Sequence, residues 1–174
     1  MEITILGRQD LENLVQKNSK QYDVVYYTHS ESPKIDLIEK NALDSLHMPV
    51  DDIDHYELKF HISPTASSVK RFLDFGKGRK KLVVACAAGV SRSSSTAYLI
   101  AAQEYGPKTA LTFLKPTHHF PNRLNVYIGS VLLKDPKVWE EYLAWSKHWS
   151  GVDPSHAGVW PRKELISGMG FDKV

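Results

Sequence analysis

The stretch Leu82–Ala85 is an unbroken apolar run, and it constrains the fold of this chain more than any other feature. Such a run is typical of a strand covered on both faces, as in a parallel sheet. After a short loop, residues 93–105 form a segment that is largely apolar through its middle and ends at Gly106. A helix with so little polar surface is expected in the middle of a domain. The sequence therefore predicts a buried strand–loop–helix unit at the centre of an α/β fold.

The rest of the chain first alternates strand and helix patterns and then accumulates helices. Runs rich in β-branched or aromatic residues predict strands at 3–6, 22–28 and 46–50. Helical spacing predicts helices at 10–17, 35–43, 64–75, 107–114, 121–133 and 136–149, and Asp10, Ser32 and Ser63 are expected to cap the first three. We expect one α/β domain over residues 1–150, with a mostly parallel central sheet of four to five strands flanked by helices. Residues 151–174 are expected to form a C-terminal extension of unknown role.

The composition excludes several classes of protein. Hydrophobic residues make up 42% of the 174 residues and the net charge is +2, which excludes a disordered chain and a polycationic nucleic-acid binder. The single cysteine, Cys86, excludes an internal disulfide framework and a thiolate-rich zinc site. The longest apolar stretch, 82–90, is too short for a membrane span, and the N-terminus lacks the basic region of a signal peptide. We expect a cytoplasmic protein with no membrane partner.

Charge is distributed unevenly along the chain. Residues 1–60 hold 12 acidic and 6 basic residues, whereas residues 61–174 hold 8 acidic and 16 basic ones. The densest basic run is Lys77–Lys81, which holds three lysines and one arginine around Gly78. It is either a patch for an anionic partner or, as the simpler interpretation, a solvated loop between a helix and a strand.

The loop between the buried strand and the buried helix has residues suited to anion binding. A tight strand-to-helix turn directs successive backbone N–H groups toward one point, at the positive end of the helix. Gly89 lets the backbone fold where a Cβ would obstruct it, and the Arg92 guanidinium can hold two oxygens of a phosphate. At this place the Cys86 thiol should have a pKa below the free value of about 8.5, down to roughly 5–6. The loop therefore predicts a cysteine nucleophile directed at phosphorus.

The spacing Cys86-x5-Arg92-Ser93 resembles the signature of the cysteine-based protein tyrosine phosphatases. The segment CAAGVSRS, residues 86–93, is especially similar to their dual-specificity branch. Two other stretches resemble the same branch. LHMPVDD, residues 46–52, corresponds to the strand end that carries the general acid, which falls on Asp52. KPTHHFPN, residues 115–122, corresponds to a helix start that braces the phosphate loop through Asn122, and the whole resemblance spans roughly residues 20–133.

The resemblance implies a two-step mechanism that needs no metal or organic cofactor. Cys86 would attack the phosphoryl group, and Asp52 would protonate the leaving oxygen and later activate a water. The Ser93 hydroxyl would stabilise the departing thiolate. The residues expected to bind the substrate phosphate are Ala87, Ala88, Gly89, Val90, Ser91, Arg92 and Asn122. Asp54 and Asp51 are alternative candidates for the acid, since acidic residues are dense in this stretch.

One position departs from the family pattern. The family has a histidine directly before the cysteine, where this chain has Ala85. That histidine is a hydrogen-bond partner behind the loop and helps to lower the pKa of the cysteine. We therefore expect a slower or differently tuned enzyme rather than an inactive one. His47, His55, His61, His118 and His119 match no metal-ligand spacing, so they are expected on the surface or in packing.

Three functions follow from this interpretation. The first is a cysteine-dependent phosphatase of the dual-specificity type, acting on phosphotyrosine and also on phosphoserine or phosphothreonine in proteins. The second is a phosphatase of RNA 5′-ends or of a small phosphate ester. Because 87–91 contains no Lys or Arg, the loop disfavours highly charged inositol phosphates. The third is a phosphate-binding module with little turnover, against which the joint presence of Cys86, Arg92 and Asp52 argues.

Overall fold

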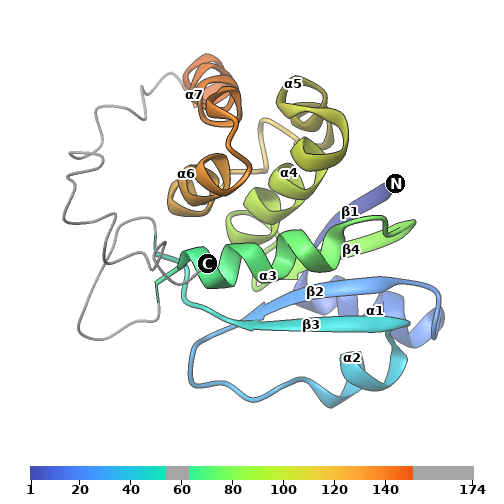
Figure 1. Ribbon diagram of the computed structural model, residues 1–174. Helices are drawn as coiled ribbons and strands as arrows, with labels where there is room; N and C mark the ends of the chain where they lie inside the picture. Colours follow the sequence, from blue (N-terminus) through green and yellow to red (C-terminus); the bar gives the residue numbers. More distant parts are fainter. Residues whose placement is uncertain (54–62, 151–174) are drawn as a thin grey trace.

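Four parallel strands form one sheet in the computed structural model, which describes residues 1–53 and 63–150 (Figure 1). The strand order is β1 (Glu2–Gly7), β4 (Lys81–Cys86), β2 (Asp23–Thr28), β3 (Asp44–Pro49). Because the strands are parallel, their carboxyl ends lie at one edge, where Gly7 pairs with Cys86 and Thr28 with Pro49. The prediction of an α/β domain with a parallel central sheet is confirmed. The expected extension, 151–174, lies outside the described residues.

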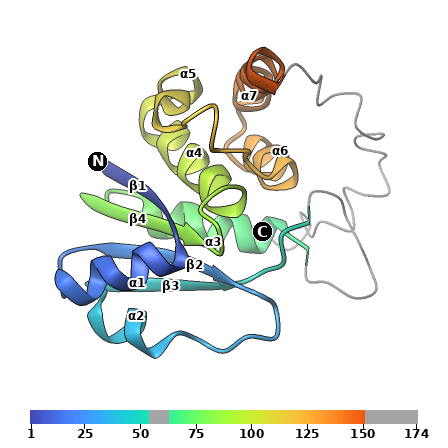
Figure 2. The same ribbon diagram turned by 180° about the vertical axis from the view of Figure 1, so that it is seen from behind.

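Helices cover both faces of this sheet (Figure 2). One face carries α1 and α2, the other carries α3 and α4, and α6 packs against α3 and α4. The short α5, a 3-10 turn (Leu111–Phe113) and α7 pack on the same side as α4 and α6. The helices span Arg8–Lys17 (α1), Asp36–Asn41 (α2), Ala66–Gly76 (α3), Arg92–Tyr105 (α4), Pro107–Ala110 (α5), Arg123–Leu132 (α6) and Pro136–Ser150 (α7). Within the described residues, no helix has both the length and the apolar character needed to cross a membrane.

Strand β4 contributes to the cores on both faces of the sheet, as its unbroken apolar run predicts. Side chains of a strand alternate between faces. Val83 and Ala85 join the smaller core beneath α1 and α2. Leu82, Val84 and Cys86 join the larger core, which also contains much of α4. Cys86 is thus placed at the carboxyl edge of the sheet on the face that α4 covers.

Three predicted helix caps are wrong. Asp10 lies inside α1, which begins directly after Gly7, because β1 continues through Gly7 and leaves no connecting loop. Ser32 lies in the loop before α2, whose N-cap is Ile35. Ser63 is likewise too early, since Thr65 caps α3.

A reciprocal pair of hydrogen bonds explains why α3 begins after Thr65. The Thr65 hydroxyl accepts from the Ser68 N–H at 3.1 Å, and the Ser68 hydroxyl accepts from the Thr65 N–H at 2.8 Å. This capping box satisfies two backbone donors at once, whereas a cap at Ser63 would satisfy only one.

The basic run 77–81 lies at the amino end of the strands, at the opposite edge from Cys86. Its arginine, Arg79, donates to Asp23 at 2.8 Å and to Asp44 at 2.6 Å. Asp23 and Asp44 are the first residues of β2 and β3, so this arginine links two neighbouring strands. Arg79 also lies over the Phe75 ring at 4.3 Å. The arginine of this run therefore has a structural role.

Candidate active site

The loop 87–91 joins the end of β4 to the start of α4, and its conformation depends on Gly89. This residue has φ +74°, a left-handed conformation that residues with a Cβ rarely adopt. A Cβ here would also lie 2.6 Å from the backbone N of Gly7 and from the carbonyl carbon of Leu6. Gly89 thus lets the loop pack directly against the end of β1.

Replacing Gly89 by alanine is expected to destabilise the protein by about 2–5 kcal/mol, the sum of left-handed strain and overpacking. The matched control is Gly78→Ala, because Gly78 has φ +72° and a Cβ there would have no atom of a described residue beyond its chain neighbours within 4 Å. The control should lose only the strain, about 1–2 kcal/mol. Urea denaturation of both variants measures the difference. Equal losses would show that the contact with β1 is unimportant.

Two further hydrogen bonds brace the loop from both sides. The Arg8 N–H, at the start of α1, donates to the Ala87 carbonyl at 3.2 Å. The Phe120 N–H donates to the Val90 carbonyl at 3.0 Å, from the segment that leads into α6. The loop is held by elements that are distant in sequence, so its shape is fixed by the fold.

Cys86 lies at the floor of this loop with 3% of its surface exposed. Burial raises the pKa of the thiol, but hydrogen bonds outweigh it. The Ser93 hydroxyl lies 3.2 Å from Sγ, and the backbone N–H groups of Ser93, Val90 and Gly89 also stabilise the thiolate. The resulting pKa of Cys86 lies below its ordinary value. This environment favours a nucleophilic sulfur.

Arg92, the first residue of α4, is 3% exposed and fixed by the ends of two strands. Its Nη1 donates to the Thr28 carbonyl at 3.0 Å and to the Val50 carbonyl at 2.7 Å. Its guanidinium carbon lies 5.6 Å from the centre of the Tyr27 ring. Its Nε is buried and has no hydrogen-bond partner among the described residues. A buried, charged N–H without a partner is costly unless a ligand accepts from it.

Asp52 reaches the same loop from the segment after β3. Its Oδ1 accepts from the Ser91 hydroxyl at 2.7 Å and from the Asn122 side-chain amide at 3.1 Å. Its Oδ2 lies 3.7 Å from Arg92 Nε. Asn122 is also the N-cap of α6, since its Oδ1 accepts from the Asn125 N–H at 3.1 Å. Asp52 therefore lies close to both Arg92 and the loop 87–91.

The other two candidate acids are placed differently. Asp51 is 6% exposed, and its Oδ1 accepts from the Ser30 N–H at 3.1 Å and lies 3.5 Å from His29 Nδ1. These contacts are with the loop after β2. Asp54 lies outside the described residues, as do His55 and His61. Among the described acids, Asp52 is the one in contact with both Ser91 and Arg92.

Ala85 is 1% exposed and faces the core beneath α1 and α2, on the side of the sheet opposite to Cys86. Its neighbours in that core include Val15 and Tyr26. Since alanine has no side-chain polar group, the hydrogen bonds that lower the pKa of Cys86 come from Ser93 and the loop amides.

Among the described histidines considered above, His47 and His119 take part in packing, whereas His118 is exposed. His119 is 3% exposed, and its Nδ1 accepts from the Lys115 N–H at 2.9 Å. Burial lowers the pKa of His119 to about 4, so this ring is neutral near pH 7. His47 stacks on the Tyr26 ring at 5.0 Å. Over residues 1–53 and 63–150, no three His, Cys, Asp or Glu side chains gather to hold a metal ion.

Two groups of site atoms escape sequence analysis. The first is the pair of carbonyls, Thr28 and Val50, that hold Arg92, because any residue type supplies a carbonyl. The second is the Ser91 hydroxyl, because the loop pattern predicts only that the backbone of Ser91 binds an anion. A serine at the start of a helix would ordinarily suggest that its side-chain oxygen caps the helix.

Comparison with solved structures identifies the fold. The Yvh1 phosphatase domain from Chaetomium thermophilum is similar with a TM-score of 0.52 and 12% identity, covering 76% of this chain and 90% of that one. DUSP15 is similar with a TM-score of 0.50 and 16% identity, covering 86% and 90%. PTPMT1 in complex with PI(5)P is similar with a TM-score of 0.50 and 13% identity, covering 81% and 94%.

This chain has the dual-specificity phosphatase-like fold. The resemblance noted in the loop, at the strand end before Asp52 and at the helix start after Pro121 thus extends to the arrangement of strands and helices. At these identities the similarity establishes the fold alone. No family model matches the chain, and no curated protein matches it in sequence.

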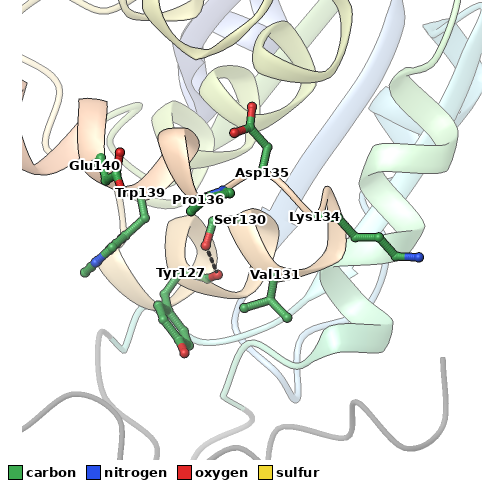
Figure 3. Close-up of a pocket in the computed structure, with 8 residues that line it drawn as sticks. All are labelled: Tyr127, Ser130, Val131, Lys134, Asp135, Pro136, Trp139 and Glu140. Atoms are coloured by element: carbon green, nitrogen blue, oxygen red, sulfur yellow. Dashed lines mark hydrogen bonds between the residues drawn. The ribbon is translucent and has the colours of Figure 1, made fainter.

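A hollow lies between α6 and α7, with a volume of about 440 Å³ (Figure 3). The Trp139 ring packs edge-on against Tyr127 at 5.6 Å on one side of it. It is lined by Tyr127, Ser130, Val131, Lys134, Asp135, Pro136, Trp139 and Glu140. None of these residues belongs to the phosphate loop, so this hollow is separate from the candidate active site.

Proposed function

We propose that this chain is a cysteine-dependent phosphatase that hydrolyses phosphate monoesters through a phosphocysteine intermediate. The observation that carries the proposal is the buried Nε of Arg92, which has no hydrogen-bond partner among the described residues and lies beside the loop that lowers the pKa of Cys86. A phosphoryl group supplies the anionic oxygens that this N–H and the loop amides can hold. The Cys86 thiolate supplies the nucleophile.

In the first step the Cys86 sulfur attacks phosphorus in line with the leaving oxygen. The S–P bond forms as the O–P bond breaks, and the Arg92 guanidinium and the amides of 87–92 stabilise the charge on the equatorial oxygens. The proton of Asp52 passes to the leaving oxygen, so the alcohol leaves neutral. Asp52 is placed for this role because it contacts Ser91 of the loop and lies 3.7 Å from Arg92, the residue that would hold the phosphoryl group.

In the second step a water attacks phosphorus and Asp52 accepts its proton. The P–S bond breaks and inorganic phosphate is released. The Ser93 hydroxyl, 3.2 Å from Sγ, stabilises the departing thiolate by donating a hydrogen bond. We include a cytoplasmic location in the proposal, because a reducing compartment would protect such a thiolate from oxidation.

The proposed substrates are phosphotyrosine and, more broadly, phosphoserine and phosphothreonine in proteins. The exposed loop residues Ala87 and Ala88 add no positive charge to the site, which disfavours a polyphosphorylated substrate. The alternative substrates are RNA 5′-ends and small phosphate esters, and the alternative to an enzyme is a phosphate-binding module.

A substrate panel tests the proposal, with the Cys86→Ser variant subtracted as background. We expect hydrolysis of para-nitrophenyl phosphate and of a phosphotyrosine peptide, with little release from 5′-triphosphorylated RNA. A strong preference for the RNA would overturn the protein substrate. Phosphopeptide binding without hydrolysis of any ester would favour the binding module.

Asp52→Ala is expected to slow hydrolysis of an alkyl phosphate by about 10²–10⁴-fold, the usual contribution of a general acid. An aryl phosphate with a good leaving group needs no protonation in the first step, so its kcat/KM should fall far less. The comparison of kcat/KM for both esters measures this difference, because kcat/KM excludes the second step, in which Asp52 is the base. If both rates fell equally, another residue would be the acid. Asp51→Ala is the matched control, because Asp51 contacts the loop after β2 instead.

A further inference from the structure

Ser91 occupies the N-cap position of α4 but does not cap the helix. A serine at this position normally accepts from an N–H of the first helical turn. Here its side chain makes no such bond, so the first N–H groups of α4 are not engaged by their own cap residue. The Ser91 hydroxyl instead bonds to a residue outside the helix, Asp52.

The Ser91 hydroxyl donates to Oδ1 of Asp52 at 2.7 Å. The Asn122 amide donates to the same oxygen at 3.1 Å. Two donors therefore hold Oδ1, whereas Oδ2 lies on the side of Arg92, 3.7 Å from Nε. The two oxygens of this carboxyl are not equivalent.

We infer that Ser91 is a positioning residue that fixes Asp52 for proton transfer. With Oδ1 accepting from Ser91 and Asn122, the proton of the acid resides on Oδ2, which faces the group that Arg92 binds. Ser91 belongs to the loop 87–91, so its hydrogen bond ties the orientation of Asp52 to that loop. This inference rests on the proposed phosphatase function.

The backbone of Ser91 is held independently of its hydroxyl. Its carbonyl accepts from the Ser95 N–H at 3.0 Å, from the Ser94 hydroxyl at 3.0 Å and from the Asn122 N–H at 3.3 Å. Replacing Ser91 by alanine keeps all three bonds. The substitution therefore removes the link to Asp52 while the loop keeps these anchors.

Ser91→Ala is expected to lower kcat/KM for an alkyl phosphate by about tenfold, a part of the general-acid contribution to the first step. For a good aryl leaving group kcat/KM should stay within about twofold, since its first step needs no acid. Both esters are measured on one preparation, so a smaller folded fraction would lower both rates equally. Ser91→Thr retains a hydroxyl and should restore the alkyl phosphate rate.

The matched control is Ser94→Ala, which removes another α4 hydroxyl that donates to the Val90 and Ser91 carbonyls. Its effect should be the same on both esters. In an Asp52→Ala background, Ser91→Ala should cause no further decrease in the alkyl phosphate rate, because Ser91 acts through Asp52.

Three outcomes separate the possibilities. Selective slowing of the alkyl phosphate that disappears in the Asp52→Ala background supports the inference. Equal slowing of both esters, or an undiminished effect in that background, overturns it while the phosphatase function stands. A wild-type chain without Cys86-dependent hydrolysis of any ester overturns the proposed function itself.

Discussion

Replacing Cys86 by serine is expected to reduce hydrolysis of an aryl phosphate by more than about 10³-fold, because the covalent route depends on the thiolate. A serine hydroxyl fits the same place but does not ionise near neutral pH. The loop amides and Arg92 remain, so binding of inorganic phosphate should persist. Steady-state kinetics and calorimetric titration of phosphate measure the two properties. Residual activity within tenfold of wild type would exclude Cys86 as the nucleophile.

The pH dependence of the wild type follows from the same group. The pKa of Cys86 lies below its ordinary value, and the thiolate is the reactive form. The rate limb that reports Cys86 should therefore rise as pH increases through this lowered pKa and level off above it. A limb that rises only near the ordinary thiol pKa, about 8.5, would contradict the stabilised thiolate.

Arg92→Lys is expected to reduce kcat/KM by about 10²–10³-fold, the usual effect of losing a donor to a developing negative charge. The arginine donates from Nη1 to the Thr28 and Val50 carbonyls, whereas its Nε has no hydrogen-bond partner among the described residues and is proposed to donate to the phosphoryl group. A lysine has a single ammonium and cannot serve both at once. Kinetics with an aryl phosphate measure the loss.

The matched control for this variant is Arg8→Lys. Arg8 follows β1 near the same loop, but its side chain is 59% exposed and pairs with Glu12 at 3.4 Å. The control should keep activity within about twofold, since an exposed pair contributes little. A loss below about fivefold for Arg92→Lys would show that a single point charge suffices.

The fold was predictable where its signal is a pattern over many residues. The apolar run 82–85 and the largely apolar helix after it predicted the central unit, because burial on both faces leaves no polar alternation. Helix starts were harder, since several polar residues near each start can act as caps. Thr65 and not Ser63 caps α3, because Thr65 forms a reciprocal pair of hydrogen bonds with Ser68. Local geometry decides between two such nearby candidates.

The candidate site was predictable in part for a similar reason. Cys86, Gly89, Arg92 and Ser93 lie within one short loop and helix start, so their spacing alone brings them together. Asp52 and Asn122 are distant in sequence, and only resemblance to a family placed them there. The carbonyls that hold Arg92 and the diverted hydroxyl of Ser91 come from tertiary packing, which sequence spacing does not encode.

The most direct test of the account is to trap the covalent intermediate. The wild-type chain is mixed with a fast aryl phosphate, quenched within milliseconds and analysed by peptide mass spectrometry. We predict one phosphoryl group on the peptide that contains Cys86, absent from the Cys86→Ser sample and enriched in Asp52→Ala when its second step is slowed. Rapid turnover with no phosphorylated peptide, or with phosphate on another residue, would contradict it.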